Sequence, residues 1–226
     1  MDLIFDHPAG SAPEPFPPPP RDETPSGGAT VLGMLDAIGE IYPHRVVLDD
    51  GRRRLSPFLL GLMVRRLARA ILDLAPAGPV AVGLREGGMG IVATLAALAA
   101  GRDCVIVDPG RLPEAAQGCA CLVRVPRDGG AVPPGCVPLD VFLSCGLSYA
   151  LAGPDLPNAA ASSALIRFGD PSGPGLPLTR LVADGSACLA AHPPEAGALW
   201  CPDCLGALMG TLLSGRAVRI GTAADG

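Results

Sequence analysis

Residues 162–181, SSALIRFGDPSGPGLPLTRL, have the composition most suited to chemistry in this chain. A short apolar strand at 164–166 runs into a loop dense in glycine and proline, and a predicted helix begins near Thr179. This order surrounds a phosphate with backbone N–H groups and a helix N-terminus. If the chain binds a nucleotide, the candidate binding residues are therefore Ser172, Gly173, Gly175 and Thr179.

Cysteines form a second candidate site. The run WCPDC at 200–204 opens a predicted helix, as in thiol redox proteins of the thioredoxin type, and a helix N-terminus lowers the pKa of a thiol. Few residues follow Cys204, however, whereas a thioredoxin fold places most of its sheet after this motif. Cys119 and Cys121 could join Cys201 and Cys204 in a zinc site of four thiolates. Ordinary buried thiols are the competing interpretation, so no metal ligand is assigned.

Few of the side chains that catalysis commonly uses are present. All 17 basic residues are arginine, so the chain can supply neither a Schiff base nor a phosphate-binding lysine. His7, His44 and His192 are widely separated, and each is adjacent to a proline. We therefore assign no catalytic residue.

The bulk composition excludes several function classes. The chain has 226 residues, 49% of them apolar, and a net charge of −5. No basic stripe is available to displace the counterions of a nucleic acid, which excludes nucleic acid as a main partner. No run reaches about 18 apolar residues, so we expect no membrane partner. The acidic N-terminus lacks a signal-peptide pattern, which predicts a cytoplasmic protein with reduced cysteines.

The elements around these candidates follow from hydrophobic spacing, capping residues and turn residues. Residues 1–28 are rich in proline and predict a disordered arm, and residues 29–226 predict one folded domain. Expected helices cover 30–41, 57–74, 87–100, 179–191 and 203–213. Expected strands cover 45–48, 52–55, 80–84, 103–107, 121–125, 137–139, 164–166 and 216–220.

Two local patterns make sharper predictions. Asp50-Gly51 between two strands predicts a tight hairpin turn. In the helix at 57–74 a charged face predicts contact with solvent, opposite an apolar face. The charged face consists of Arg65, Arg66, Arg69 and Asp73, and the apolar face of Leu59, Leu62, Met63, Leu67 and Ile71.

The middle of the chain indicates the fold class. A buried strand at 80–84, an almost wholly apolar helix at 87–100 and a strand at 103–107 predict a βαβ unit of a parallel sheet. We therefore predict an α/β fold with a mainly parallel sheet flanked by helices.

The order of these elements and their amino-acid sequences resemble the N-terminal part of the adenylate-forming (AMP-binding) superfamily. That superfamily contains acyl-CoA synthetases, non-ribosomal peptide adenylation domains and luciferases. The resemblance is carried by VLDDGRRRLSPFLLGLMVRRLARAIL (47–72), VAVGL (80–84) and IVATLAALAAGRDCVIVDPGRLPEA (91–115). It resumes at 162–181 and, more faintly, at 203–220. It implies the fold of that N-terminal part, with ATP or AMP as the ligand of the loop at 162–181.

The loop departs from the family pattern, which reads roughly T-S-G-(S/T)-T-G-x-P-K-G. If Pro177 matches the proline of the pattern, Gly175 matches a glycine and Leu178 stands at the lysine position. Asp170 stands where a small polar residue would face phosphate, and its negative charge would repel an anion. Arg180 is the nearest cation, but it lies at a different offset.

Prolines weaken the loop further, because Pro171 and Pro174 have no N–H to donate. The resemblance thus implies a degenerate phosphate loop. The resemblance also covers only the front portion of such an enzyme. The family's later motifs, which contact adenine, ribose and magnesium, have no counterpart before Gly226, and neither does its C-terminal lysine.

Three functional hypotheses follow. The first is a truncated, catalytically inactive AMP-dependent synthetase/ligase-like protein, which acts without a cofactor as a binding or accessory subunit in acyl or amino-acid activation. This hypothesis predicts a protein partner or a homo-oligomer. The second is residual AMP-dependent ligase activity that another chain completes. The third is a thiol or zinc module at Cys201 and Cys204.

Overall fold

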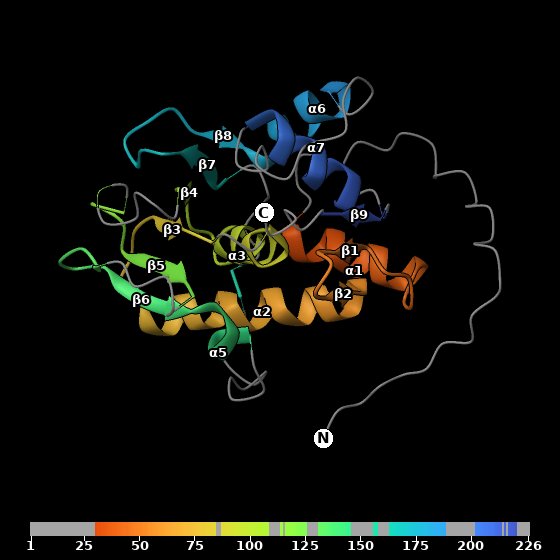
Figure 1. Cartoon of the computed structure of the whole chain (residues 1–226), viewed down its shortest axis with the longest axis horizontal. Helices are drawn as coiled ribbons and strands as arrows, with labels where there is room; N and C mark the ends of the chain where they lie inside the picture. The colour runs from red at the N-terminus through yellow and green to blue at the C-terminus, as the bar shows by residue number, and fades with distance from the viewer. Residues whose placement is uncertain are drawn as a thin grey trace, which may run out of the picture.

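Helix α3 lies at the centre of the molecule, where it contacts α1, α2, β3 and β4 (Figure 1). The computed structural model describes residues 30–84, 87–108, 114, 116–125, 131–145, 156–157, 163–188, 202–213, 215 and 217–220. The helices are α1 (Val31–Ile41), α2 (Pro57–Leu74), α3 (Gly87–Ala99), α5 (Val141–Cys145), α6 (Leu178–Cys188) and α7 (Pro202–Leu213). The strands are β1 (Leu48–Asp49), β2 (Arg54–Leu55), β3 (Val80–Val82), β4 (Cys104–Ile106), β5 (Cys121–Arg124), β6 (Val137–Asp140), β7 (Leu165–Phe168), β8 (Leu176–Pro177) and β9 (Val218–Arg219).

The main sheet confirms the predicted α/β class. Its six strands follow the order β6-β5-β3-β4-β7-β8, and every neighbouring pair is parallel except β7 and β8. Strands β3 and β4 pair in parallel with α3 between them in sequence, as the βαβ prediction requires. Figure 1 shows the strands stacked from β6 to β8, with α2 below and α6 and α7 above.

The last strand does not extend the main sheet. Strand β9 pairs in parallel with β1, which pairs with β2, so β2-β1-β9 form a second sheet of three strands. The described strands therefore form two sheets, and the larger one is the mainly parallel sheet that the sequence predicts. The sheet that β9 joins does not follow from local pattern, because strand pairing over a long sequence separation depends on tertiary packing.

Helix α3 carries the densest part of the core. All residues from Gly88 to Ala99 are buried, and the hydroxyl of Thr94 donates to the carbonyl of Gly90. The first turn of α3 lies against the β1–β2 turn, because a Cβ at Gly88 would overlap the carboxylate of Asp50. Asp50 itself is 9% exposed. Only glycine permits this close approach.

The β1–β2 hairpin is present, and its tight turn lies one residue further along than Asp50-Gly51 predicts. The N–H of Asp50 donates to the carbonyl of Arg53 at 3.1 Å, so Gly51 and Arg52 are the two residues of the turn. The Asp50 carboxylate accepts the N–H groups of Arg52 and Arg53 at 3.0 and 2.6 Å, which stabilises the turn.

Helix α2 has the predicted start, since Ser56 caps it and Pro57 is its first residue. Its charged face differs from the prediction. Arg66 is only 8% exposed and is not a solvated side chain, whereas Leu59, assigned to the apolar face, is 43% exposed. The short helix α5, which the sequence pattern did not predict, packs on α2 and covers Arg66.

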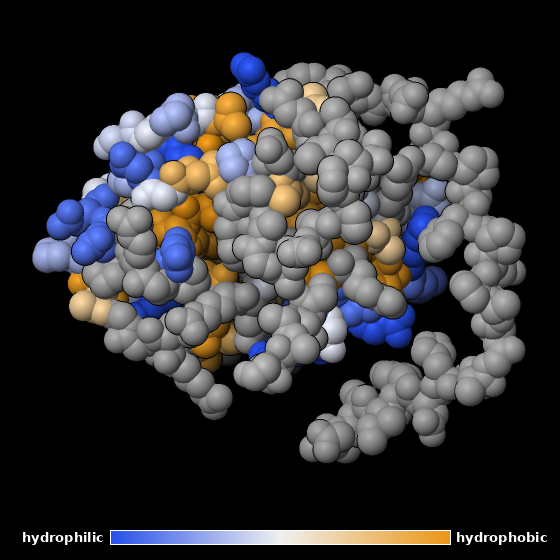
Figure 2. Space-filling model, turned by 45° about the horizontal axis from the view of Figure 1, so that its top comes forward, coloured by the Kyte–Doolittle hydropathy of each residue, from blue (hydrophilic) through white to orange (hydrophobic). Residues whose placement is uncertain are grey.

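On the face seen in Figure 2, apolar and hydrophilic residues gather in different places. In Figure 2 apolar atoms gather near the centre of the visible face, and hydrophilic atoms gather at its left end and lower right. No helix in the described part of the chain is long and apolar enough to span a membrane.

Glycine also sets the contact between α6 and α7. A Cβ at Gly206 would overlap the backbone carbonyl oxygen of Leu181, which cannot move without shifting α6. We expect Gly206→Ala to lower the free energy of unfolding by about 1–3 kcal/mol, as overpacking of a core does.

Gly39→Ala is the matched control for this substitution. Gly39 also lies within a helix, but the nearest atom to its added Cβ would be Pro57 Cβ at 3.8 Å, an ordinary contact. Gly39→Ala should stabilise the chain by about 0.5–1 kcal/mol through helix propensity. Urea unfolding of both variants measures the difference, and equal effects would contradict the close α6–α7 contact.

Candidate functional site

The candidate phosphate loop is a β-hairpin followed by a helix. Strand β7 leads into residues 169–175, strand β8 returns antiparallel to β7, and α6 begins directly at Leu178. The sequence pattern did not predict β8. The hairpin closes tightly at Gly175, because a Cβ there would lie 2.7 Å from Cβ of Leu165. Gly175 is thus required by the packing of the hairpin itself.

The backbone donors of this loop are already engaged. The N–H of Ser172 donates to the Asp170 carboxylate at 2.8 Å, and the N–H of Gly173 donates to the Asp170 carbonyl at 3.1 Å. Pro171 and Pro174 have no N–H. The four residues 171–174 therefore offer no uncommitted backbone donor to a phosphate, because Asp170 folds the loop into a self-contained turn.

The side chains at the matched family positions are not arranged around an anion. Leu178 is 1% exposed and belongs to the hydrophobic core, so the side chain at the lysine position faces inward. Ser172 is exposed, whereas Thr179 is half-buried in the first turn of α6. Arg180 is exposed on α6. The structure thus places the four candidate residues on one hairpin and the helix start that follows it. No cationic side chain stands at the matched lysine position, because Leu178 occupies it.

An arginine that the sequence analysis missed holds the loop in place. Arg167 donates from Nε to the carbonyl of Gly173 at 3.1 Å, and it forms an ion pair with Asp103 through Nη1. The other oxygen of the Asp103 carboxylate accepts the N–H of Leu165 at 2.9 Å. Arg167 therefore fixes the loop to the start of β4. A charged residue within the apolar strand 165–168 was the available sequence signal.

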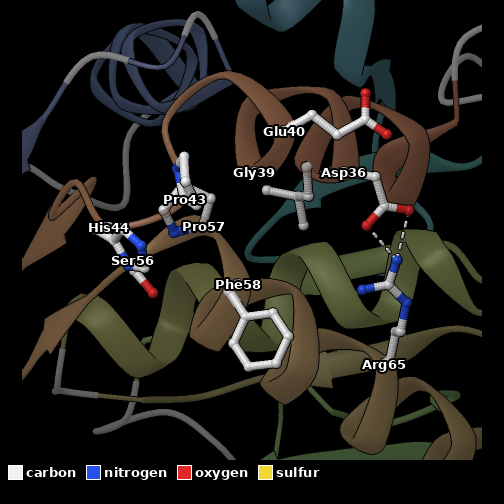
Figure 3. Close-up of a pocket in the computed structure, with 10 residues that line it drawn as sticks. Asp36, Gly39, Glu40, Pro43, His44, Ser56, Pro57, Phe58 and Arg65 are labelled. Carbon is white, nitrogen blue, oxygen red and sulfur yellow. Dashed lines mark hydrogen bonds and ion pairs between the residues drawn. The ribbon is translucent and has the colours of Figure 1, made fainter.

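A pocket of about 550 Å³ lies between α1 and the start of α2 (Figure 3). Asp36 and Arg65 form an ion pair across it, and Phe58 is exposed at its wall. The hydroxyl of Ser56 accepts the N–H of Leu59 and serves as a helix cap. Different elements form this pocket and the β7–β8 loop, so the pocket adds no group to the candidate phosphate site.

Solved structures share this architecture. The structure of VinN matches with a TM-score of 0.64 and 15% identity over 86% of this chain and 59% of that chain. The non-ribosomal peptide synthetase FmoA3 matches with a TM-score of 0.64 and 18% identity over 86% of this chain and 23% of that chain. The N-terminal subdomain of NpsA from Klebsiella oxytoca matches with a TM-score of 0.61 and 17% identity over 85% of this chain and 53% of that chain.

The chain has the fold of the N-terminal part of adenylate-forming enzymes. O-succinylbenzoate coenzyme A synthetase from Bacillus subtilis, solved with AMP, matches with a TM-score of 0.59 and 15% identity over 82% of this chain and 54% of that chain. The chain thus spans less than two thirds of the length of each of these structures, and identities this low establish the fold alone. No protein-family model matches the sequence, and neither does any curated protein.

Five thiols in the described part of the chain are buried, those of Cys104, Cys119, Cys121, Cys136 and Cys145. Cys119 and Cys121 are buried at the start of β5, and desolvation raises their pKa values to about 11 and about 12. Cys204 is half-buried in the first turn of α7, and Cys201 lies outside the described residues. Within the described ranges no three Cys, His, Asp or Glu side chains form a group able to hold a metal ion. The buried thiols are protonated at neutral pH.

These thiols predict a loss of stability at alkaline pH. Burial raises the pKa of Cys104, Cys121 and Cys145 from 9.0 to about 12. In the unfolded chain these thiols ionise near pH 9, whereas in the folded chain they stay protonated up to about pH 12. The free energy of unfolding is therefore unaffected by these thiols below pH 9, and it falls as pH rises from 9 towards 12. Each thiol contributes a slope of up to about 1.4 kcal/mol per pH unit.

Urea unfolding at a series of pH values measures this slope. Because the chain has no lysine and only two tyrosines, thiols dominate its titration in this range. Cys104→Ala should reduce the slope, whereas its cavity should lower stability equally at all pH values. A free energy of unfolding that is constant above pH 9 would contradict the burial of the thiols.

Proposed function

We propose that this chain is a catalytically inactive, adenylate-forming-like domain that acts as a binding or accessory subunit in acyl or amino-acid activation. The observation that carries the proposal is the β7–β8 loop, in which Asp170 accepts the N–H groups that a phosphate would need. The buried Leu178 at the matched lysine position supports it. The fold remains, and the groups that bind a nucleotide are replaced.

The energetics of the loop favour inactivity over weakened activity. A hydrogen bond to a charged group contributes about 1.5–3 kcal/mol, so the loss of one lysine contact alone reduces affinity about tenfold or more. The exposed Asp170 carboxylate adds repulsion against a triphosphate. Arg167 does not replace the lysine, because its guanidinium group is bound to Asp103 and Gly173.

A partner subunit is the second part of the proposal. Strand β9 is an edge strand in the described part of the small sheet, with β1 on one side only. Edge strands expose unpaired N–H and C=O groups that another chain can pair with. Among the similar structures, FmoA3 is a non-ribosomal peptide synthetase, and NpsA-ThdA is an artificially fused adenylation–PCP di-domain. We expect a heteromeric partner or a homo-oligomer, in the cytoplasm.

Ligand-induced thermal stabilisation tests inactivity. We expect the melting temperature of the chain to stay unchanged with millimolar Mg·ATP or AMP, because a ligand stabilises only in proportion to RT ln(1 + [L]/Kd). A saturable rise in the wild-type chain would overturn the proposal.

A loop variant tests the physical reason. Asp170→Thr combined with Pro171→Ser and Pro174→Thr restores backbone donors at exposed or half-buried positions and should increase affinity for ATP. Glu40→Gln, which removes an exposed charge from α1, is the matched control and should not. If the two variants respond alike, the loop donors do not decide nucleotide binding.

Native mass spectrometry of the chain purified from its own host tests the partner. We expect a defined complex, with a second protein or a second copy, and no nucleotide or zinc. A strictly monomeric chain at high concentration would contradict the accessory role. Adenylate formation by the isolated complex, absent from the chain alone, would instead establish the second hypothesis, in which another chain completes the ligase.

A further inference from the structure

Helix α2 carries two arginines that each have at least one buried N–H group without an acceptor in the described part of the chain. Nε of Arg66 and both Nε and Nη1 of Arg69 are buried without a hydrogen-bond partner. Arg66 is 8% exposed, and Arg69 is half-buried. Buried charges in folded proteins are paired, because an unpaired one costs several kcal/mol. This arrangement therefore lacks a negative group.

Arg66 and Arg69 lie on the same face of α2. Residues three apart on a helix project from one face, with Cβ atoms about 5–6 Å apart. Arg66 donates from Nη1 to the carbonyl of Cys145 at 3.4 Å, and Sγ of Cys145 lies 3.8 Å from the carbonyl of Met63. The end of α5 therefore covers the α2 turn that carries Arg66, and Arg69 lies one turn further along.

One carboxylate, that of Asp140, acts on this region together with two arginines. The charged groups that act on the Cys145 thiol are Arg66, Arg53 and Asp140. The Asp140 carboxylate accepts the N–H of Phe142 at 2.8 Å and that of Leu143 at 3.4 Å, so it caps α5. Arg53 adds positive charge and lies over the ring of Phe142.

Asp50 and Asp73 are two further acidic groups among the described residues. Asp50 forms an ion pair with Arg53. Asp73, one helical turn after Arg69, is exposed to solvent, whereas Nε and Nη1 of Arg69 are buried. The partial negative charge at the end of a short helix offsets part of one positive charge at most.

We propose that Arg66 and Arg69 form a binding site for a small oxyanion, a phosphate or a carboxylate group, between α2 and α5. The planar guanidinium fork donates two parallel hydrogen bonds to such a group, and two forks on one helix face can enclose it. The anion supplies the negative charge that the two arginines lack. The site is separate from the β7–β8 loop and does not depend on the proposed function.

Anion titrations of the full chain test the site at constant ionic strength, which sodium chloride maintains. Inorganic phosphate and acetate are titrated separately, and binding is followed by calorimetry and by melting temperature. We expect a saturable rise in melting temperature with at least one anion. A response to both indicates a general oxyanion site, and a response to phosphate alone indicates a phosphate site. No response to either anion would overturn the proposal.

Substitutions at Arg69 test whether the anion binds between α2 and α5. Arg69→Met should weaken anion binding about tenfold or more, because it removes charge-assisted hydrogen bonds. Without anion it should be at least as stable as the wild type, since one of two unpaired like charges is gone. Arg69→Lys keeps the charge but loses the fork, and should also bind more weakly if the methionine variant fails to fold.

Arg65→Met is the matched control. Arg65 precedes Arg66 on α2, but it forms an ion pair with Asp36 of α1 on a different face. Its loss should leave the anion response unchanged. An equal response of the Arg69 variants and the wild type would show that the anion acts elsewhere and would overturn the assignment.

Discussion

The burial of α3 is the constraint on which the rest of the structure depends. Every residue from Gly88 to Ala99 is buried, so this helix has no polar face and cannot lie at a surface. The main sheet must cover one side of it and α1 and α2 the other. The same requirement brings the β1–β2 turn against the helix start, where the close contact between Gly88 and Asp50 leaves no space for a side chain.

In the β7–β8 loop, groups that could bind a phosphate are engaged within the chain itself. Strand, loop and helix follow one another as in a phosphate cradle, but Asp170 satisfies the loop donors from within, and Arg167 fixes the loop carbonyl to β4. These bonds stabilise the hairpin without a ligand. A loop that is complete by itself has little free energy to gain from a phosphate, so structural stability and nucleotide binding compete for the same groups.

A chain without lysine uses arginine for all its cationic contacts. Arg65 pairs with Asp36 between α1 and α2, Arg167 pairs with Asp103, and the guanidinium groups of Arg45 and Arg53 lie over the rings of Tyr42 and Phe142. In each case a partner offsets the cost of desolvation. Arg66 and Arg69 differ, because the described part of the chain leaves their buried N–H groups unmatched.

The sequence by itself determined the elements that depend on local pattern. The predicted helix starts near residues 30 and 57, the apolar helix at 87–99 and the βαβ unit around it are in place. Capping and hydrophobic periodicity act within a few residues, so local sequence suffices to predict them. The fold class and the likeness to adenylate-forming enzymes followed from their order.

Only the tertiary structure decided which strands pair, so β9 joined a second sheet and β8 closed a hairpin. The tertiary structure also decided which side chains are covered and which are paired. Helix α5 covers Arg66, and Arg167 forms an ion pair with Asp103, which is 64 positions away along the chain. Contacts over such separations depend on how the whole chain packs, so the hydrophobic periodicity within one element does not predict them.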